Sequence, residues 1–328
     1  MNEKISIIIP LLNKGPYIAR AIKSVLNQTI QNFDIIVIDG GSQDNGPKIV
    51  KDFNDPRIYF FVQTGKGVSN ARNEAVNYST NEFIAFLDAD DEWLPNHLET
   101  ILRLIDTYPD AGMYTTACKI RTNDGKTRWM KYDFIPNAPW EGILPNYFKS
   151  GCIGDFPVQT SSGVIPRRIF LEMGGFPGGY WWGEDADLFG KIALKYPVAF
   201  SWEHGAVYYR DDTNRASNKM RPLEYEEPFV KTARASLKRG NVPLEFVEPL
   251  NEYIAKTEIM RAILNIRAGN SDAAQDILKQ CKTRAFYYKK IKWSLLAKMP
   301  YPIFQGMRNI KLKLLSIYRK NMKYLTVL

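Results

Sequence analysis

An apolar run that ends in three carboxylates occupies residues 83–91: Phe83-Ile84-Ala85-Phe86-Leu87-Asp88-Ala89-Asp90-Asp91. The apolar part predicts a buried strand, and the carboxylates at its mouth repel one another and are costly to desolvate. A hard cation such as Mg²⁺ or Mn²⁺ relieves that repulsion and leaves coordination positions open for phosphate oxygens. The segment therefore indicates a metal that holds a diphosphate. The alternative is a solvated acidic turn that caps a helix over residues 94–107.

Strand and helix signals alternate on the N-terminal side of this segment. Short apolar runs over residues 5–10, 33–39 and 57–63 predict strands. Apolar residues at helical spacing predict a helix that begins near Pro16 and another over residues 68–78. Strands joined by short helical crossovers imply a parallel, doubly wound sheet, in which ligands bind beyond the carboxyl ends of the strands.

The composition limits the class of protein. The chain has 328 residues, of which 45% are hydrophobic, so we expect one domain of about 200–250 residues with an appendage. Its three cysteines, Cys118, Cys152 and Cys281, are widely spaced and form neither a metal-binding pattern nor a disulfide framework. With no signal peptide and no apolar run of membrane-spanning length, the sequence predicts a cytoplasmic protein.

Positive charge is concentrated near the C-terminal end. Residues 279–328 hold thirteen Lys and Arg and no Asp or Glu, which leaves residues 1–278 with 31 basic and 35 acidic residues, a net charge of −4. Met307, Ile310, Leu314 and Ile317 fall on one predicted helical face among the basic residues. This pattern favours a peripheral anchor on anionic lipid. The alternatives are packing onto the domain and nucleic-acid binding, and the acidic body and the lack of a recognition module speak against nucleic acid.

Five sequence blocks follow one another in a recognisable order. They are Ile7-Ile8-Ile9-Pro10 with Asn13-Lys14, Ser24-Val25-Leu26-Asn27-Gln28-Thr29, Val37-Ile38-Asp39-Gly40-Gly41-Ser42-Gln43-Asp44, Gly65-Lys66-Gly67-Val68-Ser69-Asn70-Ala71-Arg72-Asn73 and Leu87-Asp88-Ala89-Asp90-Asp91. Together they resemble the family 2 inverting glycosyltransferases over about residues 4–220. The resemblance implies an α/β fold of the GT-A type: a doubly wound, mixed, mostly parallel sheet flanked by helices. We expect residues 1–220 to form this catalytic domain, and residues 221–328 to form a helical, basic extension that contacts a membrane surface or the acceptor.

The resemblance also implies a binding site for a nucleotide-sugar donor. Asp39 matches the family's nucleoside-contacting acid, and the alternative is an Asx-turn that stabilises Gly40-Gly41. The family often has an aromatic residue where this chain has Leu12 and a second acid where it has Gly40. Further residues of the same blocks are expected at the sugar donor: Pro10, Asn13, Gly67, Arg72, Asp88 and Ala89.

Charged residues are given distinct roles at the diphosphate. Arg72 follows a Gly-rich loop at the start of a predicted helix, where it can reach the diphosphate; the alternative is a solvated helix-face arginine. The family pattern makes Asp90 the direct ligand of Mn²⁺ or Mg²⁺, with Asp88 nearer the ribose or sugar. Asp91 is expected to cap the following helix. His97 is expected to pack or to face solvent rather than to bind metal. The same is expected of His204, and the alternative is a downstream histidine that joins the metal.

A second acidic pair, Glu184-Asp185, follows Trp181-Trp182. Inverting transfer needs a general base that takes the proton of the attacking hydroxyl, and a carboxylate partly desolvated by aromatic rings suits that task. The pair matches the family's Glu-Asp motif, with Asp185 as the expected base and Glu184 as the alternative. Trp181 and Trp182 are expected at the acceptor sugar. The alternative is an acidic pair that stabilises the N-terminus of a helix, and it would be preferred if the upstream blocks were absent.

These observations predict a metal-dependent hexosyltransferase that moves one sugar, from a UDP-sugar, to a hydroxyl of a glycan or lipid-linked acceptor in surface polysaccharide or glycoconjugate biosynthesis. The Gln-x-x-Arg-Trp signature of processive synthases is absent. A dinucleotide oxidoreductase would need Gly-x-Gly-x-x-Gly after the first strand, where this chain has Asn13-Lys14-Gly15-Pro16. A non-catalytic protein that binds nucleotide sugars or glycans on the same fold is the remaining alternative.

Overall fold

The computed structural model describes residues 3–122, 124–210, 222–310 and 314. The described residues fall into two compact units, one within residues 1–216 and 227–250 and one within residues 217–226 and 251–328. The predicted boundary at residue 220 places residues 227–250 in the extension. In the structure these residues lie with the first unit. Ile317, the last residue of the predicted apolar face, lies outside the described residues.

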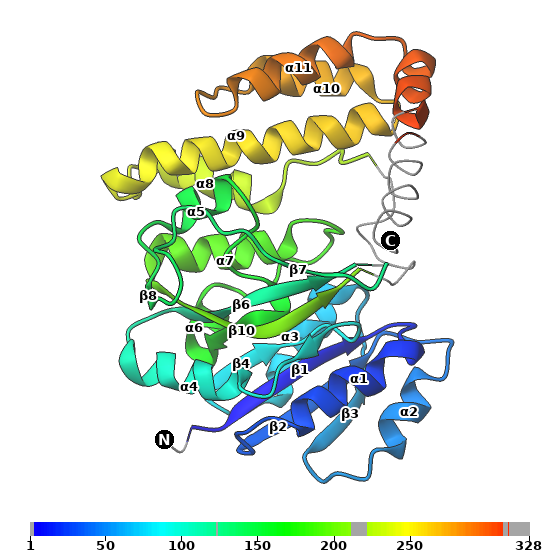
Figure 1. Ribbon diagram of the computed structural model, residues 1–328, viewed down its shortest axis with the longest axis vertical. Coiled ribbons are helices and arrows are strands. Elements are labelled where there is room, and N and C mark those ends of the chain that lie inside the picture. Colours follow the sequence, from blue (N-terminus) through cyan, green and yellow to red (C-terminus); the bar gives the residue numbers. More distant parts are fainter. Residues whose placement is uncertain (1–2, 123, 211–221, 311–313, 315–328) are drawn as a thin grey trace, which may run out of the picture. The chain divides into compact units, whose positions relative to one another are not determined.

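A ten-stranded sheet forms the centre of the described part of the first unit (Figure 1). Its order is β3-β2-β1-β4-β9-β6-β10-β5, with β7 beside β6 and β8 beside β10. The strands are β1 (Ile5–Leu11), β2 (Phe33–Asp39), β3 (Ile58–Val62), β4 (Phe83–Phe86), β5 (Glu92–Trp93), β6 (Met113–Arg121), β7 (Thr127–Trp129), β8 (Glu141–Ile143), β9 (Gly163–Pro166) and β10 (Val198–Tyr209). Six of the ten run in one direction, while β5, β7, β8 and β9 run against their neighbours. The predicted mixed, mostly parallel sheet is confirmed.

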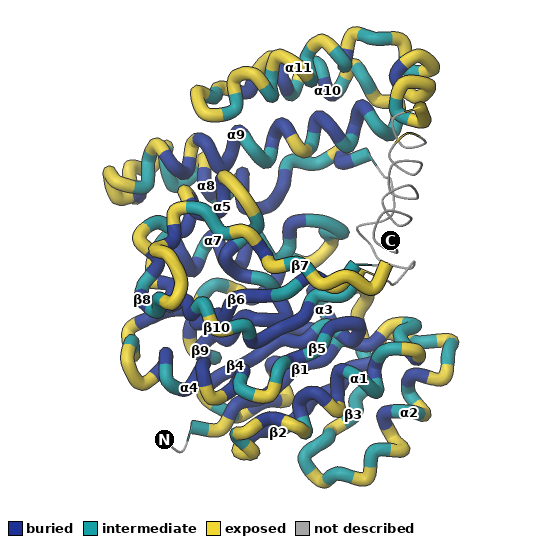
Figure 2. Tube along the Cα trace, in the orientation of Figure 1, coloured by how far each residue is buried: buried dark blue, intermediate teal, exposed yellow. Residues whose placement is uncertain are grey.

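Helices cover both faces of this sheet. In the first unit they are α1 (Gly15–Leu26), α2 (Gly46–Asp52), α3 (Val68–Tyr78), α4 (His97–Thr107), α5 (Tyr147–Cys152), α6 (Arg167–Glu172), α7 (Glu184–Lys195) and α8 (Pro228–Arg239), with a 3-10 turn at Thr160–Ser162. Alternate residues of β1, such as Ile7 and Ile9, pack in one core cluster with Ile22 of α1 and Ile101 of α4. Phe86 of β4 instead contacts Phe176, with ring centres 5.1 Å apart. The strands are accordingly buried along most of their length (Figure 2).

The segment after the acidic motif differs from the prediction. Glu92 and Trp93 form β5, which pairs with β10, and α4 begins only at His97 rather than at residue 94. The Leu94 N–H donates to the Gly205 carbonyl at 2.8 Å. The backbone of Leu94 therefore pairs with β10 and does not begin the helix that apolar periodicity predicted from residue 94. Asp91 therefore does not cap that helix.

The second unit is helical in the part that the structure describes. It contains the C-terminal part of α9 (Leu244–Arg267), α10 (Ser271–Gln280), α11 (Tyr287–Ala297) and a helical segment over residues 301–310. Ile259, Ile263, Leu278 and Phe304 belong to its core. The predicted helical extension is thus confirmed. No helix among the described residues has both the length and the apolar character needed to cross a bilayer.

Candidate active site

The loops that follow β1, β2 and β4 meet at one edge of the sheet. β1 lies between β2 and β4, with Leu11 opposite Asp39 and Ile8 opposite Phe86. Because the three strands are parallel, their carboxyl ends share one edge, which is where open α/β sheets bind ligands. The segments that hold the predicted donor residues are therefore brought together by the topology.

Asp39 is engaged by its own loop. Its buried carboxylate accepts the N–H of Gly41 at 3.3 Å and the N–H of Ser42 at 3.1 and 3.2 Å. This is the Asx-turn that the sequence allows as an alternative. A carboxylate can accept about four hydrogen bonds, so the turn leaves room for a nucleoside N–H, and that contact stays a prediction.

Asn13 connects the loops that follow β1 and β2. Its N–H donates to Ser42 Oγ at 2.9 Å, and its Oδ1 accepts the Gln43 N–H at 2.8 Å. Its backbone has φ +52, which Asn tolerates better than most residues. Asn13 thus holds the two loops together, whereas Pro10 lies within β1 opposite Ile38.

The Gly-rich loop before α3 is also tied down. Gly67 has φ +87, and its carbonyl accepts a hydrogen bond from Gln63 Nε2 at 2.9 Å. The Glu74 carboxylate of α3 accepts the N–H groups of Thr64 and Gly65 at 2.9 and 2.8 Å. The turn that leads into α3, and so to Arg72, is held by its own helix.

Arg72 joins the two acidic motifs. Its side chain is 4% exposed, its Nη2 lies 2.7 Å from Asp88 Oδ1, and its Nη1 lies 3.3 Å from Glu184 Oε1. The guanidinium also lies 5.0 Å from the centre of the Phe176 ring. The alternative of a solvated helix-face arginine is therefore wrong. Arg72 is a buried cation fixed between two carboxylates, and its contact with a diphosphate stays a prediction.

Glu184 and Asp185 are the first two residues of α7. Burial, and after it the neighbouring Asp185 carboxylate, raises the pKa of Glu184 to about 7, although Arg72 opposes the change. Asp185 Oδ1 accepts the Ala186 N–H at 2.7 Å, within the first turn of the helix. The pair offers one carboxyl group whose affinity for protons is matched to neutral pH, as a proton-transfer site requires.

The sequence pattern did not reveal the role of Asn73. Its Nδ2 donates to the Phe176 carbonyl at 2.8 Å, and its Oδ1 accepts the Phe176 N–H at 3.0 Å. Gly175 has φ +65, and a Cβ added there would stand 2.6 Å from Asn73 Oδ1. Asn73 therefore fixes the turn before α7 while its neighbour Arg72 binds Glu184. The only sequence signal was its place beside Arg72 in a recognised block.

The three residues after Asp88 are held in different ways. Ala89 is buried in the core, so its side chain does not face a ligand. Asp90 Oδ2 lies 2.8 Å from Lys14 Nζ. Asp91 is fully buried and accepts the Ser161 hydroxyl at 2.6 Å and the Tyr209 N–H at 3.0 Å. Asp91 therefore anchors the end of β10, which corrects its predicted capping role.

The acidic motif fits a divalent cation only in part. Among the residues that the structure describes, no three His, Cys, Asp or Glu side chains converge on a metal position. Asp88 and Asp90 offer hard carboxylate oxygens, and Mg²⁺ is commonly bound by one or two carboxylates with substrate phosphates completing the shell. The donor set thus suits Mn²⁺ or Mg²⁺ that arrives with a diphosphate. It would supply positive charge for the leaving group.

Neither histidine joins this site. Burial lowers the pKa of His97 to about 3, and its Nδ1 lies 3.2 Å from Thr116 Oγ1. His204 packs against the Trp129 ring with centres 4.2 Å apart, and burial lowers its pKa to about 4. Both histidines therefore pack against neighbouring side chains.

Aromatic side chains stand directly before α7. The rings of Trp181 and Trp182 meet edge to face, with centres 5.9 Å apart, and both side chains are half-buried. Their position next to Glu184 in the chain is compatible with an acceptor sugar, and that role stays a prediction.

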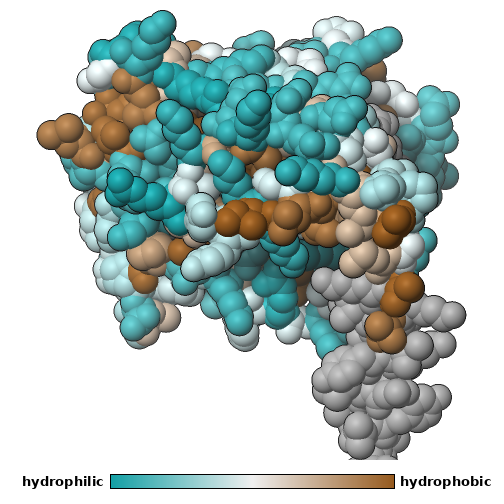
Figure 3. All heavy atoms as spheres, turned by 90° about the horizontal axis from the view of Figure 1, so that it is seen from above, coloured by the Kyte–Doolittle hydropathy of each residue, from teal (hydrophilic) through white to brown (hydrophobic). Residues whose placement is uncertain are grey.

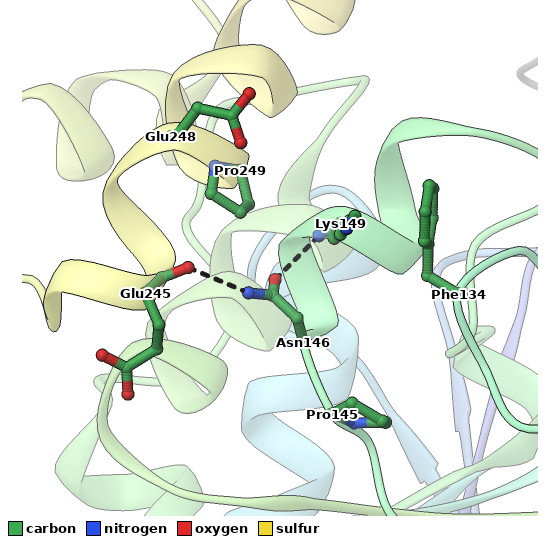
Figure 4. Close-up of a pocket in the computed structure, with 7 residues that line it drawn as sticks. All are labelled: Phe134, Pro145, Asn146, Lys149, Glu245, Glu248 and Pro249. Atoms are coloured by element: carbon green, nitrogen blue, oxygen red, sulfur yellow. Dashed lines mark hydrogen bonds between the residues drawn. The ribbon is translucent and has the colours of Figure 1, made fainter.

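A separate pocket of about 420 Å³ lies elsewhere in the first unit (Figure 4). Asn146 caps α5 there by accepting the Lys149 N–H at 2.9 Å and donates to the Glu245 carbonyl at 3.2 Å. Its lining residues are Phe134, Pro145, Asn146, Lys149, Glu245, Glu248 and Pro249. None of the predicted site residues lines it, so we do not assign the chemistry to this pocket.

Sequence comparison relates this chain to known glycosyltransferases. The model of the family described as Glycosyl transferase family 2 matches residues 6–161. Glycosyltransferase GlyG of Streptococcus pneumoniae is 34% identical over 221 residues, which cover 64% of this chain and 72% of GlyG. An uncharacterized glycosyltransferase of Rickettsia bellii is 39% identical over 232 residues, which cover 70% of this chain and 32% of that relative.

One similar enzyme has a named reaction. UDP-Glc:alpha-D-GlcNAc-diphosphoundecaprenol beta-1,3-glucosyltransferase WfgD of Escherichia coli is 44% identical over 96 residues, which cover 29% of this chain and 38% of WfgD. The chain thus matches about a third of the length of this enzyme and of the Rickettsia relative.

Solved structures share the fold over most of the chain. TarS residues 1–349 of S. aureus, in complex with UDP-GlcNAc, has a TM-score of 0.65 at 17% identity and covers 93% of this chain and 92% of its own. The mannosyltransferase PcManGT from Pyrobaculum calidifontis, in complex with GDP-Man and Mn²⁺, has a TM-score of 0.57 at 17% identity, with 93% and 86% covered. At such identities the likeness establishes the GT-A fold and leaves the substrate open.

Proposed function

The chain belongs to glycosyltransferase family 2, and we propose that it transfers one sugar from a UDP-sugar, with inversion, to a hydroxyl of a glycan or lipid-linked acceptor. The observation that carries the proposal is the position of Arg72 between Asp88 and Glu184. One buried cation links the motif expected at the sugar donor to the motif expected to hold the base. An inverting transfer needs these two groups next to one reacting carbon.

The chemistry follows from the charges at this point. Arg72, with a divalent cation held by Asp90 and Asp88, would stabilise the diphosphate as it leaves. Asp185 is our proposed base for the acceptor hydroxyl, and Glu184 is the alternative. Burial raises the pKa of Glu184 to about 7, so Glu184 can hold a proton near neutral pH. In that form it can donate a hydrogen bond to a neighbouring oxygen.

The choice of a UDP-sugar rests on Asp39 and on the relatives. A carboxylate at this strand end can accept the imide N–H of uracil, and the names of WfgD and of the TarS complex specify UDP-sugars. Leu12 and Gly40 replace residues that the family often uses here, so the base must be tested. The WfgD name specifies a diphosphoundecaprenol acceptor, which supports a lipid-linked acceptor and a role in surface polysaccharide or glycoconjugate biosynthesis.

We further propose that the second unit contacts an anionic membrane surface, from the cytoplasmic side. Residues 281–310 contain seven Lys and Arg and no Asp or Glu. On α11, Tyr288 is 86% exposed and Leu295 is 64% exposed, with Ile291 between them at helical spacing. Figure 3 shows brown apolar side chains among teal polar ones over the helices of this unit. Exposed apolar groups within a basic surface favour the interface of an anionic bilayer.

Calorimetric binding and turnover of UDP-, GDP- and dTDP-sugars test the proposed reaction. Wild type, Asp90→Asn and the exposed control Asp106→Asn are compared with Mn²⁺ and with EDTA. We expect one UDP-sugar to bind and turn over with Mn²⁺, to be lost in Asp90→Asn and to be kept in Asp106→Asn. Binding without any turnover, across acceptors, would favour a non-catalytic binding protein. Failure of every nucleotide sugar to bind would contradict the proposal.

A further inference from the structure

Lys14, just before α1, reaches the acidic motif. Its Nζ lies 2.8 Å from Asp90 Oδ2, and the two side chains are only 17% and 7% exposed. Water screens a partly buried pair less than a surface pair, so the ammonium group offsets much of the cost of burying the Asp90 carboxylate. Asp90 is also the proposed direct metal ligand. The Lys14 ammonium group and the proposed metal ion are therefore both candidate cations for this carboxylate.

The backbone that carries Lys14 is fixed on both sides. The Asn13 N–H donates to Ser42 Oγ at 2.9 Å, and the Gly15 N–H donates to Asp44 Oδ2 at 2.7 Å. The Lys14 carbonyl itself accepts two N–H bonds of the first turn of α1. The flexible four-carbon side chain is therefore the part that can move.

The backbone of Asp90 is fixed as well. Arg20 Nη2 donates to the Asp90 carbonyl at 2.5 Å, and the Arg20 guanidinium lies 3.5 Å from the centre of the Tyr209 ring. Tyr209 in turn donates its hydroxyl to Glu92 at 2.6 Å. The backbone that carries the Asp90 carboxylate is therefore held, and the longer Lys14 side chain is the partner with more freedom to move.

From this geometry we propose that Lys14 is an internal counter-ion that competes with the divalent cation for Asp90 and moves to the diphosphate when the sugar donor binds. This rests on the metal role proposed above. A cation bound at about 2.0–2.6 Å from the Asp90 oxygens would be repelled by an ammonium group on the same carboxylate. A diphosphate brings oxygen ligands for the metal and negative charge for Lys14, so it lets both cations stay.

Manganese binding in the absence of nucleotide tests the competition. The amplitude of the EPR signal of free aqueous Mn²⁺ is followed as Mn²⁺ is titrated into wild type, Lys14→Met, Lys14→Arg and Lys48→Met. Lys14→Met should bind Mn²⁺ about tenfold more tightly than wild type, the effect expected when one opposing charge is removed. Lys14→Arg keeps the charge and should resemble wild type. Lys48, exposed on α2, supplies the matched control, which should also resemble wild type.

A second series with UDP separates this inference from the metal role itself. UDP should tighten Mn²⁺ binding more in wild type than in Lys14→Met, because only wild type has to displace an ammonium group. The inference is overturned if Lys14→Met binds Mn²⁺ no more tightly than wild type while UDP still recruits Mn²⁺ to both. If neither protein binds Mn²⁺ even with UDP, the metal role fails and the competition fails with it. Lys14→Gln repeats the test should Lys14→Met not fold.

Discussion

Arg72 Nη1 lies 3.3 Å from Glu184 Oε1, although 112 positions separate the two residues in the sequence. The other terminal nitrogen of the same guanidinium donates to Asp88 at 2.7 Å. The contact depends on α3 and α7 meeting near the carboxyl end of β4. It makes one buried side chain the common partner of both acidic motifs, and several predictions rest on it.

Replacement of Arg72 by Met should destabilise the protein and abolish binding of the sugar donor. Removing one partner of a buried ion pair leaves an unpaired charge and costs about 3–5 kcal/mol, here for two carboxylates at once. Urea denaturation of Arg72→Met and of Arg103→Met compares this buried site with a half-exposed pair on Glu141. Arg103→Met should cost about 1 kcal/mol or less. Equal losses in the two variants would contradict the buried role of Arg72.

The turn before α7 should tolerate Ala at Gly174 better than at Gly175. Both glycines have positive φ, but a Cβ at Gly174 meets nothing within 4 Å, whereas one at Gly175 stands 2.6 Å from Asn73 Oδ1. Gly175→Ala should therefore lower the free energy of unfolding by about 1–3 kcal/mol more than Gly174→Ala. This difference in the free energy of unfolding between the two variants should shrink when Asn73 is also changed to Ala. A difference that does not depend on Asn73 would show that the backbone alone causes it.

The stability of the protein should fall with rising pH in a way that Glu184→Gln removes. The folded state raises the pKa of Glu184 from 4.5 to about 7, so it holds this proton more tightly than the unfolded chain. The stabilisation that the folded state gains from this proton is present in full below about pH 4.5 and is lost as the pH rises through about 7. Between about pH 5 and pH 8, wild type should lose on the order of 1–3 kcal/mol relative to Glu184→Gln. Parallel urea curves at the two pH values measure the difference, and its absence would show that Glu184 is ionised throughout.

Substitutions of Glu184 and Asp185, the first two residues of α7, should differ in their kinetic effects. If Asp185 is the base, Asp185→Asn should lower kcat by about 10²- to 10⁴-fold and leave the affinity for the sugar donor nearly unchanged. Glu184→Gln should weaken binding of the sugar donor as well, because it alters the partner of Arg72. Measurement of kcat and of donor affinity by calorimetry decides the assignment. The reverse pattern would make Glu184 the base.

Charge substitutions on α11 should release the protein from anionic vesicles. Leu295→Glu places a carboxylate on the exposed basic surface of the second unit and should reduce co-sedimentation with vesicles that contain phosphatidylserine or phosphatidylglycerol at low salt. Leu244→Glu, at an exposed position of the first unit, is the matched control. Equal binding of the two variants would contradict a membrane role for α11.

Much of the fold could be predicted because its signals are local. The strand over residues 83–87 and the helix over residues 68–78 follow from apolar periodicity, and the observed α3 spans Val68–Tyr78. The start of α4 could not be predicted, because the pairing of Trp93 with Ala206 is a contact across the sheet. Periodicity within a short window carries no information about such a partner.

The site, like the fold, could be predicted only where its signals are local in the sequence. The resemblance predicted roles for Arg72, Asp88 and Glu184, but only the folded chain shows the hydrogen bonds between them. Asn73 and Lys14 lie within the recognised blocks, but no role could be predicted for them because each contacts a residue far away in sequence. Asp91 was misassigned for that reason too, since its partners Ser161 and Tyr209 belong to later segments.

The stereochemistry of donor cleavage tests the central claim most directly. Proton NMR follows the sugar released when the purified enzyme, with Mn²⁺ and no acceptor, hydrolyses the UDP-sugar that binds it, here taken as an α-linked donor. Direct attack by water activated at the Glu184-Asp185 pair should give the β-anomer first, before it equilibrates. The account predicts this signal in wild type and its loss in Asp185→Asn. Initial release of the α-anomer, or no cleavage of any nucleotide sugar, would contradict it.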